Sequence, residues 1–198
     1  MENILFDFIS KYIFLSEDEK RTMLSLNIFH TFKKGTVLLK EGQYSFNGYF
    51  VLKGCIRKFY ILDGEEKTTE FYTEMEGIKP NCVFSRQPSE YYISCVEDSS
   101  ITVSNPDMEV EIFERFPKFE TLYRMLSEQR LIKKHRSFDD FKTSSPERRY
   151  LNLLQNRSDL LKRVPLSQLA SFLGITAPSL SRMRNRLVEK KKQVHCLS

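Results

Sequence analysis

The sequence lacks long apolar runs, and it lacks the N-terminal pattern of an exported protein. No apolar run reaches the roughly 18 residues that suggest a membrane-spanning helix. The opening stretch, MENILFDFISKYIFLSEDEK, is acidic and amphipathic, without the basic start and small-residue cleavage site of a signal peptide. We therefore expect a cytoplasmic protein with no membrane partner.

Closely spaced cysteines and clustered histidines are also missing. The cysteines are far apart and form no Cys-x-x-Cys pair, so reduced, partly buried thiols are expected and no metal site is predicted. The sequence contains no Ser-His-Asp arrangement and no phosphate-cradling glycine loop, and its carboxylates are scattered as on a solvated surface. We therefore predict no catalytic residues and no enzyme. The cysteines are Cys55, Cys82, Cys95 and Cys196.

Positive charge is concentrated at one end of the chain. From Ser145 to the end there are 11 Lys and Arg and 3 Asp and Glu, a net charge of +8. Residues 1–144 carry 20 basic and 23 acidic side chains, a net charge of −3. A basic C-terminal part predicts a polyanionic partner. Charge alone does not distinguish among DNA, RNA and an acidic surface.

The first two thirds of the chain combine helical and strand-like patterns. Residues 2–30 have helical spacing, and Ser16 with Glu19 forms a capping box. From Phe32 to about Val103, short aromatic and β-branched runs alternate with turn residues, which predicts an antiparallel sandwich or barrel. Asp63-Gly64 between two such runs predicts a hairpin.

A long helix is predicted at residues 117–142, with a proline at its start. It carries a stripe of side chains at steps of three and four. Such a stripe packs into the core of its own chain or forms a dimer seam, and the spacing leaves both alternatives open. The stripe consists of Phe119, Leu122, Leu126 and Gln129.

A C-terminal unit is predicted to begin at residues 143–146, Thr-Ser-Ser-Pro, where Ser145 can cap the next helix. After a loop at 159–164, residues 166–187 read as two short helices around Gly174, with Thr176 able to cap the second. The second helix presents a polar outer face with arginines. Because arginine is the usual bidentate partner of guanine in the major groove, this face together with the basic charge favours duplex DNA.

With these features the chain resembles the Crp/Fnr family of bacterial transcription regulators over nearly its whole length. Its L-x-x-L-A-x-x-L-G-I-T run and the following Ser-Arg resemble the family's helix-turn-helix. KKGTVLLKEGQ and GYFVLKGCIRKFYI resemble the opening strands of the cyclic-nucleotide-binding β-roll. The resemblance implies an α+β fold: a sensory roll with flanking helices at 1–116, a connecting dimerisation helix at 117–142, and a winged-helix-type helix-turn-helix domain at 143–198.

The resemblance implies a homodimeric, sequence-specific DNA-binding regulator. Each subunit would place the helix at 176–187 in one half-site of a near-palindromic operator, with RNA polymerase as a candidate further partner. Arg182 takes the place of the family's guanine-reading arginine, whereas Thr176 and Ser181 suit phosphate contact or positioning. The residues assigned to DNA in this way are Thr176, Ala177, Pro178, Ser179, Ser181, Arg182 and Arg186.

The sequence departs from the family where cyclic AMP would bind. The family's cassette has a Gly-Glu pair and then Arg-Ser or Arg-Thr, but here Glu90-Tyr91 stands in the second place. A carboxylate there would repel a cyclic phosphate, so cyclic nucleotide binding is not expected unless a reshaped loop lets Arg86 substitute. The pocket would then take another small-molecule effector or be filled by its own side chains. The candidate pocket residues are Arg86, Ser89, Glu90 and Tyr91.

Two further departures concern cofactors and the wing. No cysteine precedes Cys55, so the family's N-terminal iron–sulfur cluster is not expected. After Leu187 only VEKKKQVHCLS remains, which predicts a short or missing wing. Either DNA binding is weakened as a result, or phosphate contacts from Lys190–Lys192 compensate. The shortened wing also supports an alternative function, a small-molecule-binding regulatory module with vestigial DNA binding.

Overall fold

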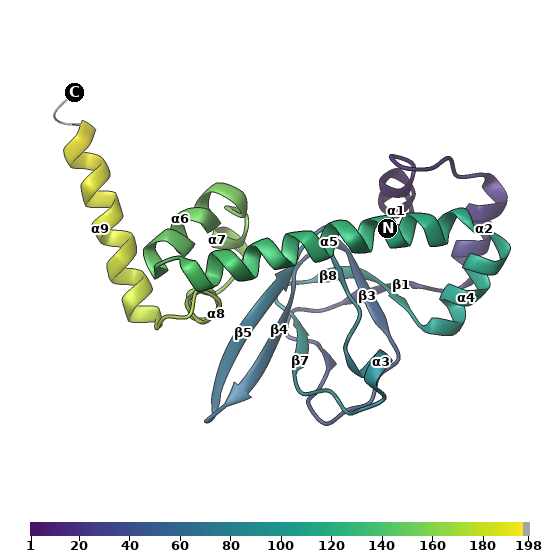
Figure 1. Cartoon of the computed structure of the whole chain (residues 1–198), viewed down its shortest axis with the longest axis horizontal. Coiled ribbons are helices and arrows are strands. Elements are labelled where there is room, and N and C mark those ends of the chain that lie inside the picture. The colour runs from purple at the N-terminus through teal and green to yellow at the C-terminus, as the bar shows by residue number, and fades with distance from the viewer. Residues whose placement is uncertain (196–198) are drawn as a thin grey trace.

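A computed structural model of the chain describes residues 1–195, and it describes side-chain exposure as far as Glu189. An N-terminal helical segment, a β-roll, a long helix and a C-terminal helical unit follow one another (Figure 1). The expected α+β architecture is confirmed. The helices are α1 (Glu2–Ile9), α2 (Glu17–Ser25), α3 (Cys82–Ser85), α4 (Pro106–Arg115), α5 (Lys118–Thr143), α6 (Pro146–Asn156), α7 (Leu160–Arg163), α8 (Leu166–Phe172) and α9 (Ala177–His195).

Two antiparallel sheets form the roll, with strand orders β1-β8-β3-β6 and β2-β7-β4-β5. Their inward-facing side chains, including Leu39, Val51 and Ile93, make one core. The predicted hairpin joins β4 to β5, and Asp63 and Gly64 both adopt the positive φ that such a turn requires. The strands are β1 (Phe29–Phe32), β2 (Val37–Leu39), β3 (Gly48–Lys53), β4 (Ile56–Leu62), β5 (Glu65–Tyr72), β6 (Gly77–Ile78), β7 (Tyr92–Cys95) and β8 (Ser99–Ser104).

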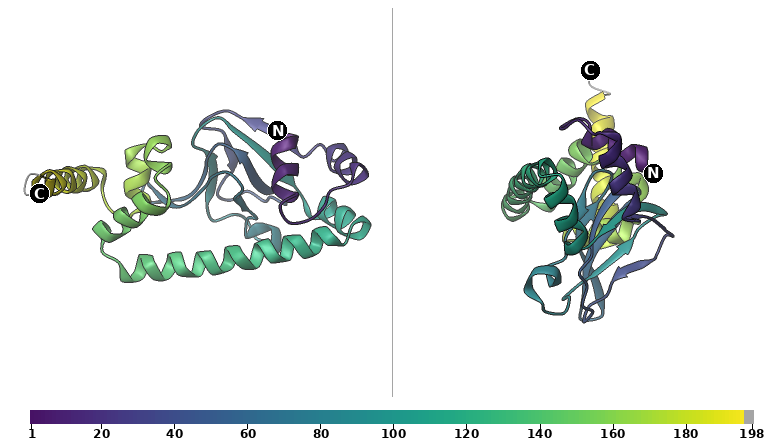
Figure 2. Two further views of the ribbon diagram at one scale, coloured as in Figure 1. Left: turned by 90° about the horizontal axis from the view of Figure 1, so that it is seen from above. Right: turned by 90° about the vertical axis from the view of Figure 1, so that its right-hand side faces the viewer.

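Helices close one end of the roll. α1, α2 and α4 pack around the beginning of α5, and a second core joins them to the roll (Figure 2). The predicted capping box begins α2, since the Ser16 hydroxyl accepts a hydrogen bond from the Glu19 amide at 3.3 Å and the Glu19 carboxylate accepts one from the Ser16 amide at 2.7 Å. Beyond this end, α5 follows one flank of the roll toward the C-terminal unit (Figure 2).

Three elements differ from the sequence-based predictions. The N-terminal helices end at Ser25, and Phe29 is already in β1 because it pairs with Thr102 of β8. The predicted loop at 159–164 contains the short helix α7. Instead of ending near residue 187, α9 continues to His195, because no glycine or proline follows Pro178 to stop it.

Other described features bear on the cofactor and membrane predictions. Cys55, Cys82 and Cys95 are buried free thiols, and Cys196 lies outside the described residues. Among the side chains that the structure describes, up to Glu189, no three His, Cys, Asp or Glu are placed to hold a metal ion together. None of the helices in this range is both long and apolar enough to span a bilayer.

Candidate functional site

The helix-turn-helix consists of α8, a turn at Gly174 and α9. Gly174 has a φ of +70°, and an added Cβ would lie 3.2 Å from the Phe141 ring, so both backbone and space favour glycine. The Ile175 amide donates to the Ala170 carbonyl at 3.0 Å, which closes the turn. Leu169 and Leu180 are buried between the two helices. Local turn chemistry and apolar spacing therefore produce the predicted hairpin.

The first turn of α9 is held by its own hydroxyls. The Thr176 hydroxyl donates to the Ser179 hydroxyl at 2.9 Å and accepts from the Ser179 amide at 3.4 Å, which confirms Thr176 as the cap. The Arg182 side chain lies back toward this turn, where its Nε donates to the Pro178 carbonyl at 3.4 Å. The guanidinium is thus exposed beside the N-terminal end of the helix.

The outer face of α9 gathers the predicted DNA contacts in one place. Thr176, Pro178, Ser181, Arg182 and Arg186 are exposed. Ala177 and Ser179 are half-buried beside them. Thr176 caps α9, and the other six lie on its first three turns. The side chains of Lys190–Lys192 and the residues after His195 lie outside the described part of the chain, so the short or missing wing stays a prediction.

Arg149 is a structural residue that sequence reasoning missed. Its guanidinium donates to the carbonyls of Leu173, Phe141 and Ser144 at 3.0 to 3.1 Å, and it lies 4.2 Å from the centre of the Phe141 ring. Arg149 therefore ties the end of α5 to the turn of the helix-turn-helix. The only sequence signal was its positive charge, which is shared with its neighbours.

The four candidate pocket residues differ in exposure. Ser89 and Tyr91 are buried, whereas Arg86 and Glu90 are exposed. The Tyr91 side chain fills the interior of the roll, is 2% exposed, and accepts a hydrogen bond from the Asn81 amide through its hydroxyl at 2.9 Å. The space near the cassette is thus occupied by tyrosine, and Glu90 faces solvent.

Further polar side chains complete the interior around Tyr91. The Lys58 ammonium lies 4.2 Å from the centre of the Tyr91 ring, and burial lowers the pKa of Lys58. Tyr72 is 3% exposed, donates to Glu70, and has its pKa raised chiefly by burial. The guanidinium carbon of Arg130 in α5 lies 5.6 Å from the centre of the Tyr72 ring, and the Arg130 Nη2 is buried without a hydrogen-bond partner among the described residues. These residues carry no sequence motif and were not predicted.

The stripe on α5 divides between two environments. Phe119 and Leu122 are buried in the core formed with α1, α2 and α4, so for them the structure favours the core alternative. Leu126 is half-buried against the same core and Gln129 is exposed. None of these four residues presents an exposed apolar side chain to a partner.

A different side of α5 is apolar and exposed. Tyr123, Leu131 and Phe138 are 43%, 56% and 61% exposed, and Phe141 is 42% exposed near the end of the helix. Leu131 and Phe138 are seven residues apart, and Figure 2 shows that the outer flank of α5 faces away from the rest of the chain. Seven-residue spacing keeps side chains on one side of a helix, as in a two-helix seam.

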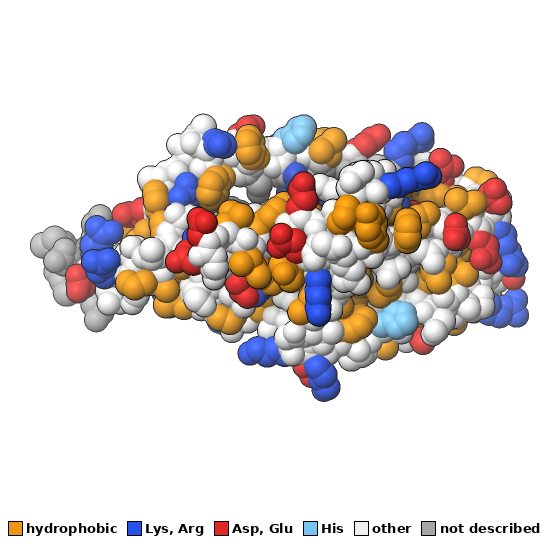
Figure 3. Space-filling model, turned by 90° about the horizontal axis from the view of Figure 1, so that it is seen from below, with side chains coloured by type: hydrophobic (Ala, Val, Ile, Leu, Met, Phe, Trp, Pro, Cys, Tyr) orange, Lys and Arg blue, Asp and Glu red, His pale blue; other side chains and the backbone are white. Residues whose placement is uncertain are grey.

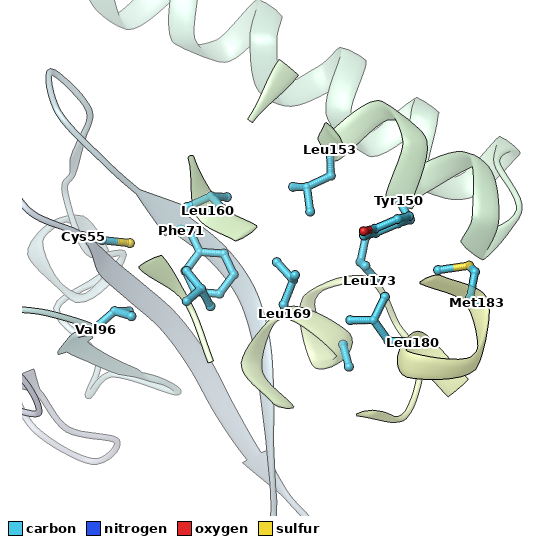
Figure 4. Packing of buried hydrophobic residues seen from close by; sticks show 12 residues of the cluster. Cys55, Phe71, Val96, Tyr150, Leu153, Leu160, Leu169, Leu173, Leu180 and Met183 are labelled. Carbon is cyan, nitrogen blue, oxygen red and sulfur yellow. The ribbon is translucent and has the colours of Figure 1, made fainter. Parts of the chain in front are cut away.

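The C-terminal unit shares a core with the roll. Cys55 and Phe71 of the roll lie against Leu160 and Leu169 of the C-terminal unit, and these four side chains are buried in one cluster (Figure 4). The Phe71 and Phe172 rings are 5.3 Å apart, edge to face. Burial raises the pKa of the Cys55 thiol to about 12. The helix-turn-helix is therefore docked on the roll.

Charge on the roll itself is mixed. Figure 3 shows the face that carries the tips of the roll, where acidic, basic and hydrophobic side chains are interspersed rather than gathered by sign. A surface of this kind gives a duplex little net attraction. The exposed arginines on α9 are therefore the better candidate for polyanion contact.

The fold matches solved transcription regulators. A c-di-GMP-responsive global regulator of Xanthomonas campestris, CLP, superposes with a TM-score of 0.70 at 13% identity, over 89% of this chain and 93% of that chain. FixK2 of Bradyrhizobium japonicum gives a TM-score of 0.65 at 14% identity, over 82% and 85%. A protein of Eubacterium rectale assigned to the Crp/Fnr family of transcriptional regulators gives 0.65 at 19% identity, over 88% and 85%.

Sequence comparisons add nothing to this likeness. No family model matches the chain, and no curated protein matches it. At 13% to 19% identity, the structural matches show the fold, which is that of Crp/Fnr-type regulators. The resemblance in fold that was inferred from sequence motifs is therefore confirmed by the three-dimensional structure.

Proposed function

We propose that this chain is a dimeric, sequence-specific DNA-binding transcription regulator of the Crp/Fnr type. The observation that carries the proposal is the outer face of α9, where exposed Arg182 lies beside exposed hydroxyls on a helix-turn-helix. A helix N-terminal end with this chemistry suits entry into the major groove. The proposed division of labour is a sensory roll at 1–116, a dimer helix at 117–142 and a DNA-binding unit at 143–198.

In this proposal Arg182 reads a guanine through its two-pronged guanidinium. Thr176 and Ser181 contact phosphate and set the register of α9 on the duplex. Exposed Arg186, one turn further along the helix, adds electrostatic attraction to the phosphate backbone of DNA. The half-buried Ala177 and Ser179 offer only small surfaces to base edges beside exposed Pro178.

Dimerisation is proposed through the outer side of α5. Exposed Leu131 and Phe138 form its centre, and the seam places two copies of α9 in successive half-sites of a near-palindromic operator. CLP, by its description, responds to c-di-GMP. For this chain we propose regulation without cyclic AMP, because Tyr91 and Tyr72 fill the interior near the cassette.

The filled interior also weighs against the alternative function, a small-molecule-binding module with vestigial DNA binding. Such a module needs a preformed cavity lined by a few polar groups. In this roll the corresponding space holds Tyr91 and Tyr72, each no more than 3% exposed. A small-molecule effector would therefore have to displace side chains of the protein or bind elsewhere.

The test compares Arg182→Ala with Arg182→Lys and with Arg184→Ala, an exposed arginine on the same helix. Affinity is measured for a duplex selected by the wild-type protein and for mixed-sequence DNA. Loss of a bidentate guanine contact costs about 1–3 kcal/mol, so Arg182→Ala should weaken binding to the selected duplex roughly tenfold to a hundredfold. Arg182→Lys should lose nearly as much affinity for the selected duplex, because lysine keeps the positive charge but cannot form the bidentate hydrogen bonds of a guanidinium.

Binding to mixed-sequence DNA should change much less for either Arg182 variant. Arg184→Ala should affect the two kinds of DNA alike. Equal losses on both DNAs for Arg182→Ala would make Arg182 a phosphate contact and remove the proposed readout.

A further inference from the structure

Lys58 extends from β4 and lies against the aromatic interior of the roll. Its ammonium is 4.2 Å from the centre of the Tyr91 ring and 5.5 Å from the centre of the Tyr60 ring. Lys58 is half-buried, and Tyr91 beside it is 2% exposed. Lysine is rarely buried unless its charge is paired, so its partners in this position decide what the side chain can do.

The Lys58 ammonium has no counter-ion of its own. Within the part of the chain that the structure describes, it takes part in no hydrogen bond and no ion pair. Its cross-strand neighbour is Glu70 of β5. That carboxylate instead accepts a hydrogen bond from the Tyr72 hydroxyl and pairs with Lys134 of α5 at 2.9 Å. Lys58 is therefore held by the faces of aromatic rings rather than by a carboxylate.

This environment favours the neutral amine over the ammonium. Burial is the main cause that lowers the pKa of Lys58, and the charges of Glu70 and Glu90 oppose it only in part. A neutral lysine amine is a nucleophile, and desolvation is one way in which proteins activate lysine toward carbonyl compounds. Lys40 and Lys53 of the same roll are exposed and lack this environment.

The surroundings of Lys58 also limit what it can react with. The carboxylates of Glu70 and Glu90 repel anions, so they favour a neutral carbonyl compound over an acyl phosphate. The interior beside the amine holds Tyr91 and Tyr72, each no more than 3% exposed, which disfavours a large ligand. A small aldehyde meets both conditions, because it is neutral and adds only a few atoms to the side chain.

We propose that Lys58 is a carbonyl-reactive site, at which a small aldehyde is captured as an imine. The amine nitrogen attacks the carbonyl carbon, and a carbon–nitrogen double bond replaces the carbon–oxygen double bond. The oxygen leaves as water with the two hydrogens of the neutral amine, so nothing is oxidised or reduced. The inference concerns the roll and does not rest on the proposed DNA binding.

The experiment treats the full chain with acetaldehyde at neutral pH in the presence of cyanoborohydride, which reduces each imine to a stable N-ethyl-lysine. Peptide mass spectrometry then gives the initial rate of modification at each lysine. Lys40 and Lys53 are the internal references, because both are exposed on the roll. Tyr60→Ser removes one ring beside the amine, and Tyr44→Ser is its matched control, since Tyr44 is 61% exposed.

We expect Lys58 to react roughly threefold to tenfold faster than Lys40 and Lys53, because a larger fraction of its amine is neutral. Tyr60→Ser should bring the rate at Lys58 close to that of the references, because water then stabilises the ammonium. Tyr44→Ser should leave the rate at Lys58 unchanged.

A rate at Lys58 equal to or below that of the references overturns the proposal, because it identifies a protonated ammonium that is merely packed on the rings. A fast Lys58 that stays equally fast in Tyr60→Ser also contradicts the proposal, since the aromatic surroundings would then not be the source of its reactivity.

Discussion

At the scale of single residues, the neighbours Glu90 and Tyr91 lie in opposite environments, one in solvent and one inside the roll. The sequence showed that Glu90-Tyr91 replaces the expected Arg-Ser, and charge repulsion was the predicted consequence. In the structure Glu90 is exposed, and the neighbouring Tyr91 fills the roll. Successive side chains in an extended segment point to opposite sides, so only one of these two neighbours can face inward. The sequence motif did not show which of the two it would be.

Tyr91 is expected to support the stability of the roll. Removing a buried aromatic side chain leaves a cavity, so Tyr91→Ala should lower the free energy of unfolding by about 3–5 kcal/mol. Tyr91→Phe should cost about 1 kcal/mol, because only the hydroxyl that accepts from Asn81 is lost. Urea unfolding measures both changes.

The matched control is Tyr44→Ala, since Tyr44 is 61% exposed. Its effect should stay within about 0.5 kcal/mol. A Tyr91→Ala variant as stable as this control would mean that the interior of the roll is not packed around Tyr91.

At the scale of elements, local signals predicted most boundaries. The capping box of α2, the Asp63-Gly64 hairpin and the Ser145 cap of α6 all lie where the sequence indicated. The exposed side of α5 was missed because Lys134 interrupts the apolar residues around Leu131 and Phe138. A periodic stripe shows which residues share a face of a helix but not whether that face meets the same chain or another one.

The outer side of α5 is expected to be the dimer seam. Leu131→Glu/Phe138→Glu should convert the dimer to a monomer at micromolar concentration, because two carboxylates from each chain would be desolvated in the seam. Sedimentation velocity measures the change.

Ile132→Glu is the control on the same helix. Ile132 is 55% exposed, but it is rotated by about 100° from Leu131. This variant should remain dimeric. A dimer that survives the double substitution, or that is lost equally in Ile132→Glu, places the seam elsewhere.

At the scale of the whole molecule, the order of parts was predictable and their docking was not. Periodicity and composition are local, so they indicated a roll, a long helix and a helix-turn-helix in sequence. Arg163 of the C-terminal unit pairs with Glu74 and Glu97 of the roll, which are 89 and 66 residues away. Pairs at such separations leave no pattern in one sequence, because surface arginines and glutamates are common.

The core that the roll shares with the C-terminal unit could not be predicted either, because it too joins residues far apart in the sequence. Cys55 and Phe71 looked like ordinary strand residues, and Leu160 lay in a predicted loop. Only the folded chain brings them into contact (Figure 4). The same contact that stabilises the docked arrangement brings the β4–β5 hairpin to the start of α9.

The most direct test of the central claim is selection of duplexes from a random DNA pool by the purified protein, without added ligand, at about 0.1 M salt. We predict enrichment of a two-fold symmetric site with half-sites about one helical turn apart, near 10 base pairs. If the protein enriches no site and retains DNA only weakly and without sequence preference, the chain is not the sequence-specific regulator proposed.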